Sequence, residues 1–235
     1  MDATTDREMT SPSLYADKPA GYFDLVREDV LALIPRGTRR LLDVGCGTGA
    51  TARAAKDRLE IAEAWGIEGT ERASQVAGPR LDRVLSGDVE TCTVPAPDGY
   101  FDCILCADIL EHTRDPWAVL RELRRLLDPK GVLVVSLPNL RHLRPLWSLV
   151  ADRFEYEESG ILDRSHLRFF TLHTMREMLA ETGYEILRRS ENRSRNRLYD
   201  ALVVCSLGLL KPFTVYQYLF VARPVRSSPG PGGRR

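Results

Sequence analysis

The segment from Asp43 to Gly49 reads Asp-Val-Gly-Cys-Gly-Thr-Gly and carries three glycines spaced two residues apart. Glycine has no Cβ, so the backbone can turn there at positive φ and approach a ligand closely. A helix is expected from about residue 49, and the free N–H groups of its first turn point at whatever occupies the loop. These residue types in this order predict a binding site for a nucleotide-type cofactor.

The glycine spacing helps to distinguish between cofactors. A dinucleotide site carries G-x-G-x-x-G, whereas the third glycine here comes one residue earlier. The segment resembles the first motif of the class I S-adenosylmethionine (SAM)-dependent methyltransferases, hydrophobic-D-x-G-x-G-x-G. The resemblance implies SAM as cofactor, S-adenosylhomocysteine as product, and Asp43 near the amino group of the methionine moiety. Cofactor contacts are predicted for Asp43, Gly45, Cys46, Gly47 and Gly49.

Two carboxylates follow the next two expected strands, and ligands of open α/β sheets bind at the carboxyl ends of the strands. Glu68 can accept hydrogen bonds from both ribose hydroxyls of the cofactor, although it also fits the start of the following helix. Asp88 can accept a hydrogen bond from the adenine amino group while Val89 packs on the ring. With Gly69, these residues form the predicted nucleoside part of the site.

The segment Phe101–His112 begins with Phe-Asp and ends with Leu-Glu-His, as in many class I methyltransferases. The resemblance implies that the backbone around Cys106, Ala107 and Asp108 faces the methionine part of SAM. For His112 two interpretations stay open: it ties its loop to the sheet, or it takes part in catalysis.

A second motif, Gly-Ile-Leu-Asp-Arg-Ser-His-Leu-Arg-Phe-Phe-Thr, occupies residues 160–171 and follows Pro-Asn-Leu-Arg-His at 138–142. The combination resembles bacterial small-molecule methyltransferases, many of which act on sugars, surface polysaccharides or natural products. His166 is the predicted general base for an acceptor hydroxyl, because histidine titrates in the right range, and Asp163 joins it as a catalytic candidate. Alternatively, Asp163, Arg164 and His166 form a polar network that fixes this segment against the sheet.

Contacts with the acceptor are predicted for Asn139, just after a strand, for Arg168 in the second motif and for Tyr22 near the N-terminus, where it also fits an apolar stripe. Some class I O-methyltransferases gather Asp and Asn around a metal at strand ends, and Asp108 and Asn139 could be arranged in that way. A third carboxylate at a convincing position is missing, so no metal is predicted.

Strand and helix patterns alternate along the chain, which predicts an α/β fold with a doubly wound, Rossmann-like sheet. The resemblance implies seven strands, mostly parallel, with the last antiparallel. Strands are expected at about 40–44, 62–67, 82–86, 101–106, 132–137, 184–190 and 214–222. Helices are expected at about 21–34, 49–59, 70–77, 116–127 and 171–182.

One methyltransferase domain is predicted at 14–225, between disordered ends at 1–13 and 226–235. It includes an N-terminal helical lid and two insertions on the substrate side, at 14–36, 138–170 and 191–212. The apolar stretch 198–210 is too short to span a bilayer. It is expected to cover the active site or to form a dimer face, with contact to a membrane surface as the third alternative.

The composition limits the classes of partner that the protein is expected to bind. The 33 basic and 33 acidic residues give a net charge of zero, which argues against a general nucleic-acid binder. The basic run at 188–197 is expected to be a solvated loop. Five cysteines at irregular spacing predict no disulfide framework, and Cys103-x-x-Cys106 lacks the second ligand pair of a structural zinc site. Without a signal peptide or a membrane span, a cytoplasmic monomer or homodimer is expected.

The predicted function is therefore methyl transfer from SAM to a small-molecule acceptor at a hydroxyl oxygen, in sugar or secondary-metabolite biosynthesis. Three alternatives stay open: N-methylation of a small amine, an oxidoreductase that binds NAD, and a subunit that binds SAM without catalysis.

Overall fold

The computed structural model describes residues 24–193 and 196–225. The disorder expected at 1–13 and 226–235 and the placement of Tyr22 lie outside the described residues.

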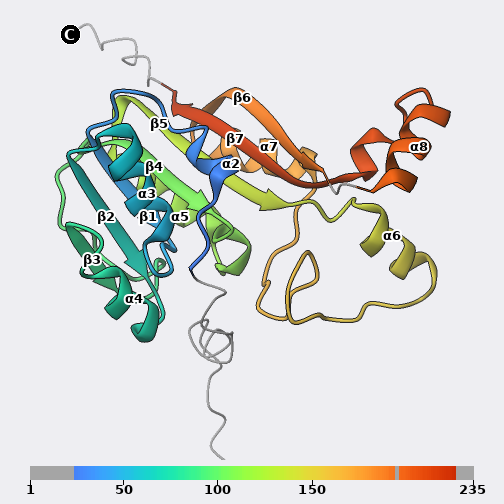
Figure 1. The fold of residues 1–235 in the computed structure, drawn as a ribbon, viewed down its shortest axis with the longest axis horizontal. Coiled ribbons are helices and arrows are strands. Elements are labelled where there is room, and N and C mark those ends of the chain that lie inside the picture. The colour runs from blue at the N-terminus through green and yellow to red at the C-terminus, as the bar shows by residue number, and fades with distance from the viewer. Residues whose placement is uncertain (1–23, 194–195, 226–235) are drawn as a thin grey trace, which may run out of the picture.

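Within the described chain, seven strands form one sheet in the order β3-β2-β1-β4-β5-β7-β6 (Figure 1). The strands β1 to β5 are mutually parallel, and β7 lies antiparallel between β5 and β6. This arrangement confirms the expected Rossmann-like sheet with an antiparallel last strand. The bounds are β1 Arg40–Val44, β2 Glu63–Glu68, β3 Arg83–Ser86, β4 Phe101–Ala107, β5 Leu127–Pro138, β6 Tyr184–Arg193 and β7 Val215–Pro224.

Helices cover both faces of the sheet, because the apolar strands β1, β4 and β5 are buried on both sides. Leu41 packs in the core beneath α2, α3 and α4, whereas Leu42 packs in the core beneath α5 and α7. The bounds are α2 Glu28–Leu31, α3 Ala50–Leu59, α4 Glu71–Ala77, α5 Pro116–Leu126, α6 Leu143–Val150, α7 Leu172–Glu181 and α8 Arg197–Cys205, with 3₁₀ turns η2 Leu110–His112 and η3 Lys211–Phe213. Each helix described here is too short or too polar to cross a membrane.

The strand order reverses between β1 and β4. The chain runs outward from β1 to β2 and β3 on one side, and from β4 to β5 on the other. The carboxyl ends of these strands meet at one edge, where Val44 lies beside both Ile67 and Cys106. Open α/β sheets bind their ligands at such a switch point.

The lid helix expected at 21–34 is wrong in its described part. Residues 24–27 are not helical, α2 begins at Glu28, and Leu25 is 67% exposed instead of lying on a buried stripe. The physical reason is Arg27, whose backbone N–H donates to Thr51 Oγ1 at 3.1 Å while its side chain reaches Asp108. These contacts fix an extended approach to the helix.

The basic run at 188–197 is mostly strand and not the expected loop. Arg188 to Arg193 form the second half of β6, the edge strand of the sheet. Charged side chains on an edge strand protect its unpaired backbone groups against pairing with another chain.

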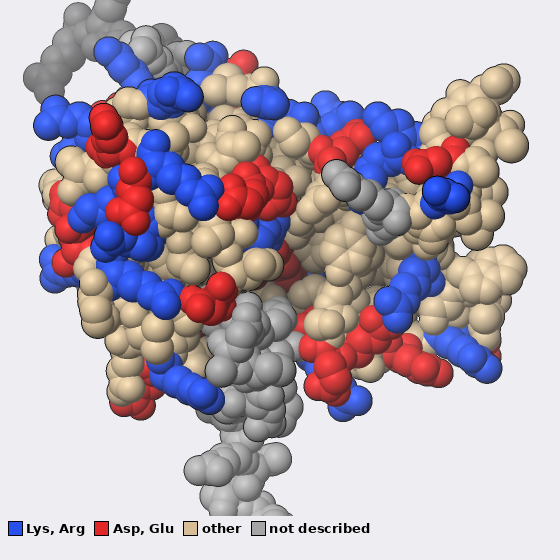
Figure 2. Space-filling model, viewed as in Figure 1, with Lys and Arg blue, Asp and Glu red and all other residues tan. Residues whose placement is uncertain are grey.

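The two insertions carry α6 and α8, which Figure 1 shows at the end of the sheet far from β1 and β2. None of the described residues at 198–210 lines the cavity at the switch point. Several large apolar side chains of this stretch face solvent, and Leu207 is 94% exposed. Figure 2 shows uncharged surface gathered at this end of the molecule.

Candidate functional site

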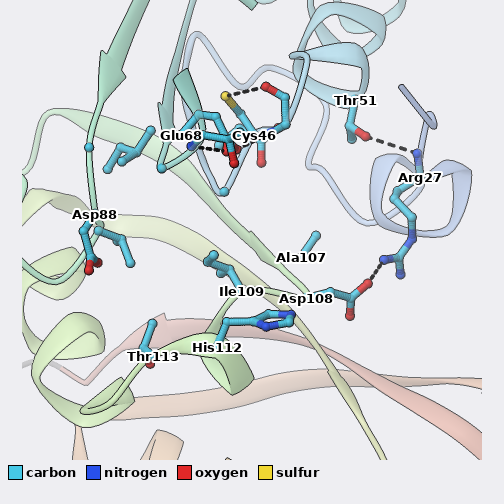
Figure 3. Close-up of a pocket in the computed structure, with 18 of the residues that line it drawn as sticks. Arg27, Cys46, Thr51, Glu68, Asp88, Ala107, Asp108, Ile109, His112 and Thr113 are labelled. Atoms are coloured by element: carbon cyan, nitrogen blue, oxygen red, sulfur yellow. Dashed lines mark hydrogen bonds and ion pairs between the residues drawn. The ribbon is translucent and has the colours of Figure 1, made fainter. Parts of the chain in front are cut away.

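A cavity of about 260 Å³ opens at the switch point, between the carboxyl ends of β1, β2 and β4. Its walls come from the glycine loop, the ends of β2 and β4, the turn at 87–89 and the segments at 25–27 and 112–113 (Figure 3). Of the predicted cofactor residues, these line it: Asp43, Gly45, Cys46, Gly47, Glu68, Gly69, Asp88, Val89, Ala107 and Asp108.

The three glycines of the loop all adopt positive φ, at 72° for Gly45, 55° for Gly47 and 76° for Gly49. A Cβ on Gly45 would lie 2.9 Å from Cδ1 of Ile109, so a side chain there meets the opposite wall. Gly49 is the N-cap of α3 and packs near Leu81, outside the cavity lining. The third glycine therefore serves the start of the helix, and the first two leave the cavity open.

Glu68 is buried and ties the loop to the next helix. Its Oε2 accepts the N–H of Gly47 at 2.8 Å, and its Oε1 accepts the N–H of Thr70, the N-cap of α4, at 2.7 Å. Each carboxylate oxygen keeps a second lone pair. Glu68 can therefore hold the start of α4 and still accept hydrogen bonds from a ligand in the cavity. The two roles considered from the sequence are compatible.

Asp43 is buried at the floor of the cavity. Burial raises its pKa to about 7, and the nearby negative charge of Glu68 adds to the rise. A cation in the cavity would stabilise the carboxylate form. The position therefore suits a positively charged ligand group.

Asp88 lies at the end of the cavity opposite Arg27 (Figure 3). Its Oδ1 accepts the N–H of Glu90 at 2.9 Å, which fixes the turn after β3. Val89 lies next to it in the wall and offers an apolar surface. This end combines a hydrogen-bond acceptor with an apolar face.

Arg27 is a cavity residue that the sequence analysis missed. Burial lowers its pKa, but hydrogen bonds and charge from Asp29 and Asp108 outweigh this and raise it. The guanidinium also donates to Gln217 Oε1 at 2.9 Å, and Asp108 accepts from Ser136 Oγ at 2.8 Å. The position of Arg27, just before a helix near the glycine loop, is the signal that could have identified this residue.

The predicted catalytic residues lie next to this cavity. His112 lines it, and His166 lies behind, with ring centroids 4.6 Å apart and planes at 69°. Asp163 Oδ1 accepts the N–H of Ser165 at 2.9 Å and its O–H at 2.6 Å, so this carboxylate orders the turn of the second motif. The side chain of Arg164 instead pairs with Glu158 at 3.1 Å.

Glu111 is a second residue that the sequence analysis missed. Its side chain is 1% exposed, and its backbone carbonyl accepts the N–H groups of Leu167 at 2.8 Å and Arg168 at 3.0 Å. Burial, reinforced by the charge of Asp108, raises its pKa well above the ordinary range. Its place in the Leu-Glu-His segment was the available signal.

The predicted acceptor residues described here do not line the cavity. Asn139 is buried and donates to the carbonyls of Val215 at 2.8 Å and Pro212 at 3.2 Å. Arg168 donates from Nε to the carbonyl of Arg114 at 3.0 Å. These two side chains hold loops together. Cys106 likewise lies outside the cavity lining, buried inside β4, where burial raises the pKa of its thiol.

The fold is shared with solved methyltransferases. A SAM-dependent methyltransferase from Archaeoglobus fulgidus superposes with a TM-score of 0.65 at 20% identity, covering 86% of this chain and 96% of that one. The doubly wound sheet with its cavity at the switch point is therefore a Rossmann-like methyltransferase fold.

The sequence identifies the family. A family model described as a methyltransferase domain matches residues 17–189, so the chain belongs to this methyltransferase family. It is 29% identical over 163 residues to a demethylmenaquinone methyltransferase of Thermotoga maritima, covering 63% of this chain and 70% of that one. It is 28% identical over 156 residues to a ubiquinone biosynthesis O-methyltransferase of Psychrobacter arcticus, covering 62% and 59%. It spans 32% of another relative, a transposon protein of Streptomyces fradiae.

Proposed function

We propose that the protein transfers a methyl group from SAM to a hydroxyl oxygen of a small molecule. The observation that carries the proposal is the order of polar groups along one cavity: Arg27 at one end, Glu68 between, and Asp88 at the other. The same order of partners suits the carboxylate, the ribose hydroxyls and the adenine amino group of SAM.

The charge of the cavity also supports SAM. Four carboxyl groups belong to its described lining, those of Asp43, Glu68, Asp88 and Asp108. Among the described lining residues, Arg27 is the only arginine or lysine. A pyrophosphate would be repelled by this set, whereas the sulfonium and ammonium groups of SAM would be attracted. The lining therefore favours SAM over NAD.

Each residue has a binding role in this proposal. Arg27 holds the carboxylate of the methionine moiety, and Asp43 faces its ammonium group. Glu68 accepts from the ribose hydroxyls, because its two oxygens keep lone pairs beyond their backbone contacts. Asp88 accepts from the adenine amino group, and Val89 packs against the ring.

SAM supplies a methyl on a sulfonium sulfur, and its transfer to a hydroxyl forms a C–O bond, breaks the S–C bond and releases the hydroxyl proton. The chain's contribution is to align the acceptor with that bond and to exclude water. His112 is the predicted catalytic residue in the cavity wall, so we place the acceptor hydroxyl beside it. The second motif at 160–171 supports a small acceptor from sugar or secondary-metabolite biosynthesis, and the ubiquinone relative supports oxygen as the methylated atom.

Isothermal titration calorimetry with SAM and with NADH tests the cofactor. SAM should bind and NADH should not, and Glu68→Ala should weaken SAM binding by about 10-fold or more, because it removes hydrogen bonds to a charged acceptor. The exposed carboxylate variant Asp98→Asn is the matched control and should bind as the wild type does. Binding of NADH without SAM would overturn the proposal.

The reaction is tested with SAM carrying a labelled methyl group and a panel of small hydroxylated and amino acceptors. Label should appear on hydroxyl oxygen. Transfer to amines alone would replace O-methylation with N-methylation, and SAM binding without turnover on any acceptor would favour a non-catalytic subunit.

A further inference from the structure

Three buried side chains meet beneath the cavity: Glu111, His112 and His166. Each offers an atom that can bind a metal, and these atoms all lie within 4.8 Å of one another. The Nε2 of His166 is 4.0 Å from Oε1 of Glu111. Glu111 and His112 are neighbours in the sequence, whereas His166 comes close to them only in the folded structure.

The carboxyl group of Glu111 has an orphaned atom. Its Oε2 is buried and has no hydrogen-bond partner among the residues that the structure describes. A buried carboxylate without compensation costs several kcal/mol, so such groups in folded proteins are neutralised by a proton, a cationic side chain or a metal. An ion between Glu111 and the two histidines would satisfy it.

The two imidazole rings are held in the form that binds metal. His112 Nδ1 lies 3.0 Å from the carbonyl oxygen of Ser165, and His166 Nδ1 lies 2.9 Å from that of Ile161. A carbonyl oxygen only accepts, so each Nδ1 carries the hydrogen, and in the neutral ring Nε2 carries the lone pair. Metal-binding histidines are oriented by the same type of backbone contact.

We propose that Glu111, His112 and His166 bind a divalent transition-metal ion, with Zn²⁺ as the best match. Two imidazole nitrogens and one carboxylate oxygen are a donor set of catalytic zinc sites, which use three protein ligands and leave a position open. Mg²⁺ and Ca²⁺ prefer all-oxygen sites. In a tetrahedral Zn²⁺ site, two ligand atoms about 2.1 Å from the ion lie about 3.4 Å apart, so the three side chains need to draw together by up to about 1.4 Å.

The ion would have a direct use, on the condition that the proposed function is correct. His112 is part of the cavity wall where we place the acceptor hydroxyl. A hydroxyl that binds the open position of a Zn²⁺ ion has a lower pKa and loses its proton to water more readily. The site would thus provide the activation that the sequence analysis assigned to a general base.

The sequence led us to expect no metal after weighing another pair of residues. Asp108 and Asn139 were the candidate ligands, but the side-chain amide of Asn139 is engaged with backbone carbonyls and its Oδ1 accepts the N–H of Arg141 at 3.1 Å. The proposed ligands come instead from η2 and from the second motif.

The test measures metal binding directly on the full chain. Protein treated with a chelator and dialysed is titrated with Zn²⁺ by calorimetry, and bound metal is counted by elemental analysis after gel filtration. We expect about one Zn²⁺ per chain and a rise in the melting temperature, because the ion joins η2 to the second motif. Mg²⁺ should give neither effect.

Two variants decide whether these residues hold the ion. Glu111→Gln removes the charge without creating a cavity, and it should fold and lose about 100-fold or more of the Zn²⁺ affinity. The matched control is Glu177→Gln, because Glu177 pairs with His173 at 3.1 Å on the exposed face of α7; it should bind Zn²⁺ as the wild type does. Wild-type protein that binds no Zn²⁺, or equal binding by Glu111→Gln, would overturn the inference.

A parallel titration of the chelated protein with SAM separates the two proposals. SAM binding without Zn²⁺ binding rejects only the metal inference, because the residues proposed to bind SAM, Arg27, Glu68 and Asp88, are not among the proposed metal ligands. Zn²⁺ binding without SAM binding retains the metal site and rejects the proposed function.

Discussion

The two sides of the cavity are built in different ways. The cofactor side, at the ends of β1, β2 and β3, uses polar residues that lie within two residues of the end of a strand. The acceptor side depends on η2 and on the insertion at 138–170, whose contacts join distant segments. Backbone geometry defines the first side and side-chain packing across loops defines the second. The difference explains how one sheet can keep a cofactor while its acceptor changes.

The largest effect is expected from a substitution that disturbs the backbone of the glycine loop on the cofactor side. Gly45→Val places a branched side chain at φ 72° and within 2.9 Å of Ile109. We expect SAM affinity to fall by more than about 1000-fold, because the residue needs both the conformation and the space. Calorimetry measures the loss. Gly37→Val is the control, since Gly37 also has positive φ but a Cβ there meets nothing within 4 Å; it should lose some stability and keep SAM affinity.

The second prediction concerns the buried carboxyl of Asp43. Its pKa of about 7 in the folded protein lies above the ordinary value of 3.8. Between about pH 4 and pH 7 the folded protein therefore keeps a proton that the unfolded chain has lost, so the free energy of unfolding falls as pH rises through this window. Asp43→Asn should lack this part of the fall, which amounts to about 4 kcal/mol.

Denaturant titrations of both proteins at several pH values between about 4 and 8 measure this difference. Asp98→Asn, a change at an exposed carboxylate, should follow the wild-type profile. Parallel profiles for the wild type and Asp43→Asn would show that the buried carboxyl does not hold its proton.

The third prediction tests the end of the cofactor side where it meets the lid segment. Arg27→Met removes the guanidinium that contacts Asp108 and Gln217. SAM affinity should fall by about 10–100-fold, the range expected for charge-assisted hydrogen bonds. Arg53→Met removes an exposed arginine paired with Asp57 and is the matched control. Unchanged SAM affinity in Arg27→Met would place the carboxylate of the cofactor elsewhere.

The smallest effect is expected at the far end of the insertion. Trp147 on α6 is 74% exposed, so Trp147→Ser should change the free energy of unfolding by no more than about 0.5 kcal/mol and leave SAM affinity unaltered. Thermal melts and calorimetry check both values. A weaker affinity for SAM would show that the two sides of the cavity are coupled through α6.

The sequence predicted the sheet well because its signals are local. The apolar runs of β1, β4 and β5 and the glycine loop each carry their own pattern. Glu68 is the last residue of β2, and Asp88 lies two residues after β3. The segment before α2 was mispredicted because an apolar periodicity was counted through Arg27, whose partners are Gln217 on β7 and Asp108 just after β4.

The acceptor side could be predicted less completely. Asn139 has the type and position of a ligand-binding residue, yet its amide is used by carbonyls near η3. The approach of His166 to Glu111 depends on how a long loop closes, and spacing along the chain does not encode that distance. The polarity of Asp163 was visible in the sequence, but its hydrogen bonds to Ser165 became clear only from the folded turn.

The position of β7 has a consequence for the order in which the protein is completed during synthesis. β6 pairs in the sheet with β7, which lies between it and β5. A chain that leaves the ribosome N-terminus first therefore cannot add β6 to the sheet until residues 215–224 have emerged. Gln217 of the same strand contacts both Arg27 and Asp108, so the last strand to be translated also finishes the wall built around some of the first residues.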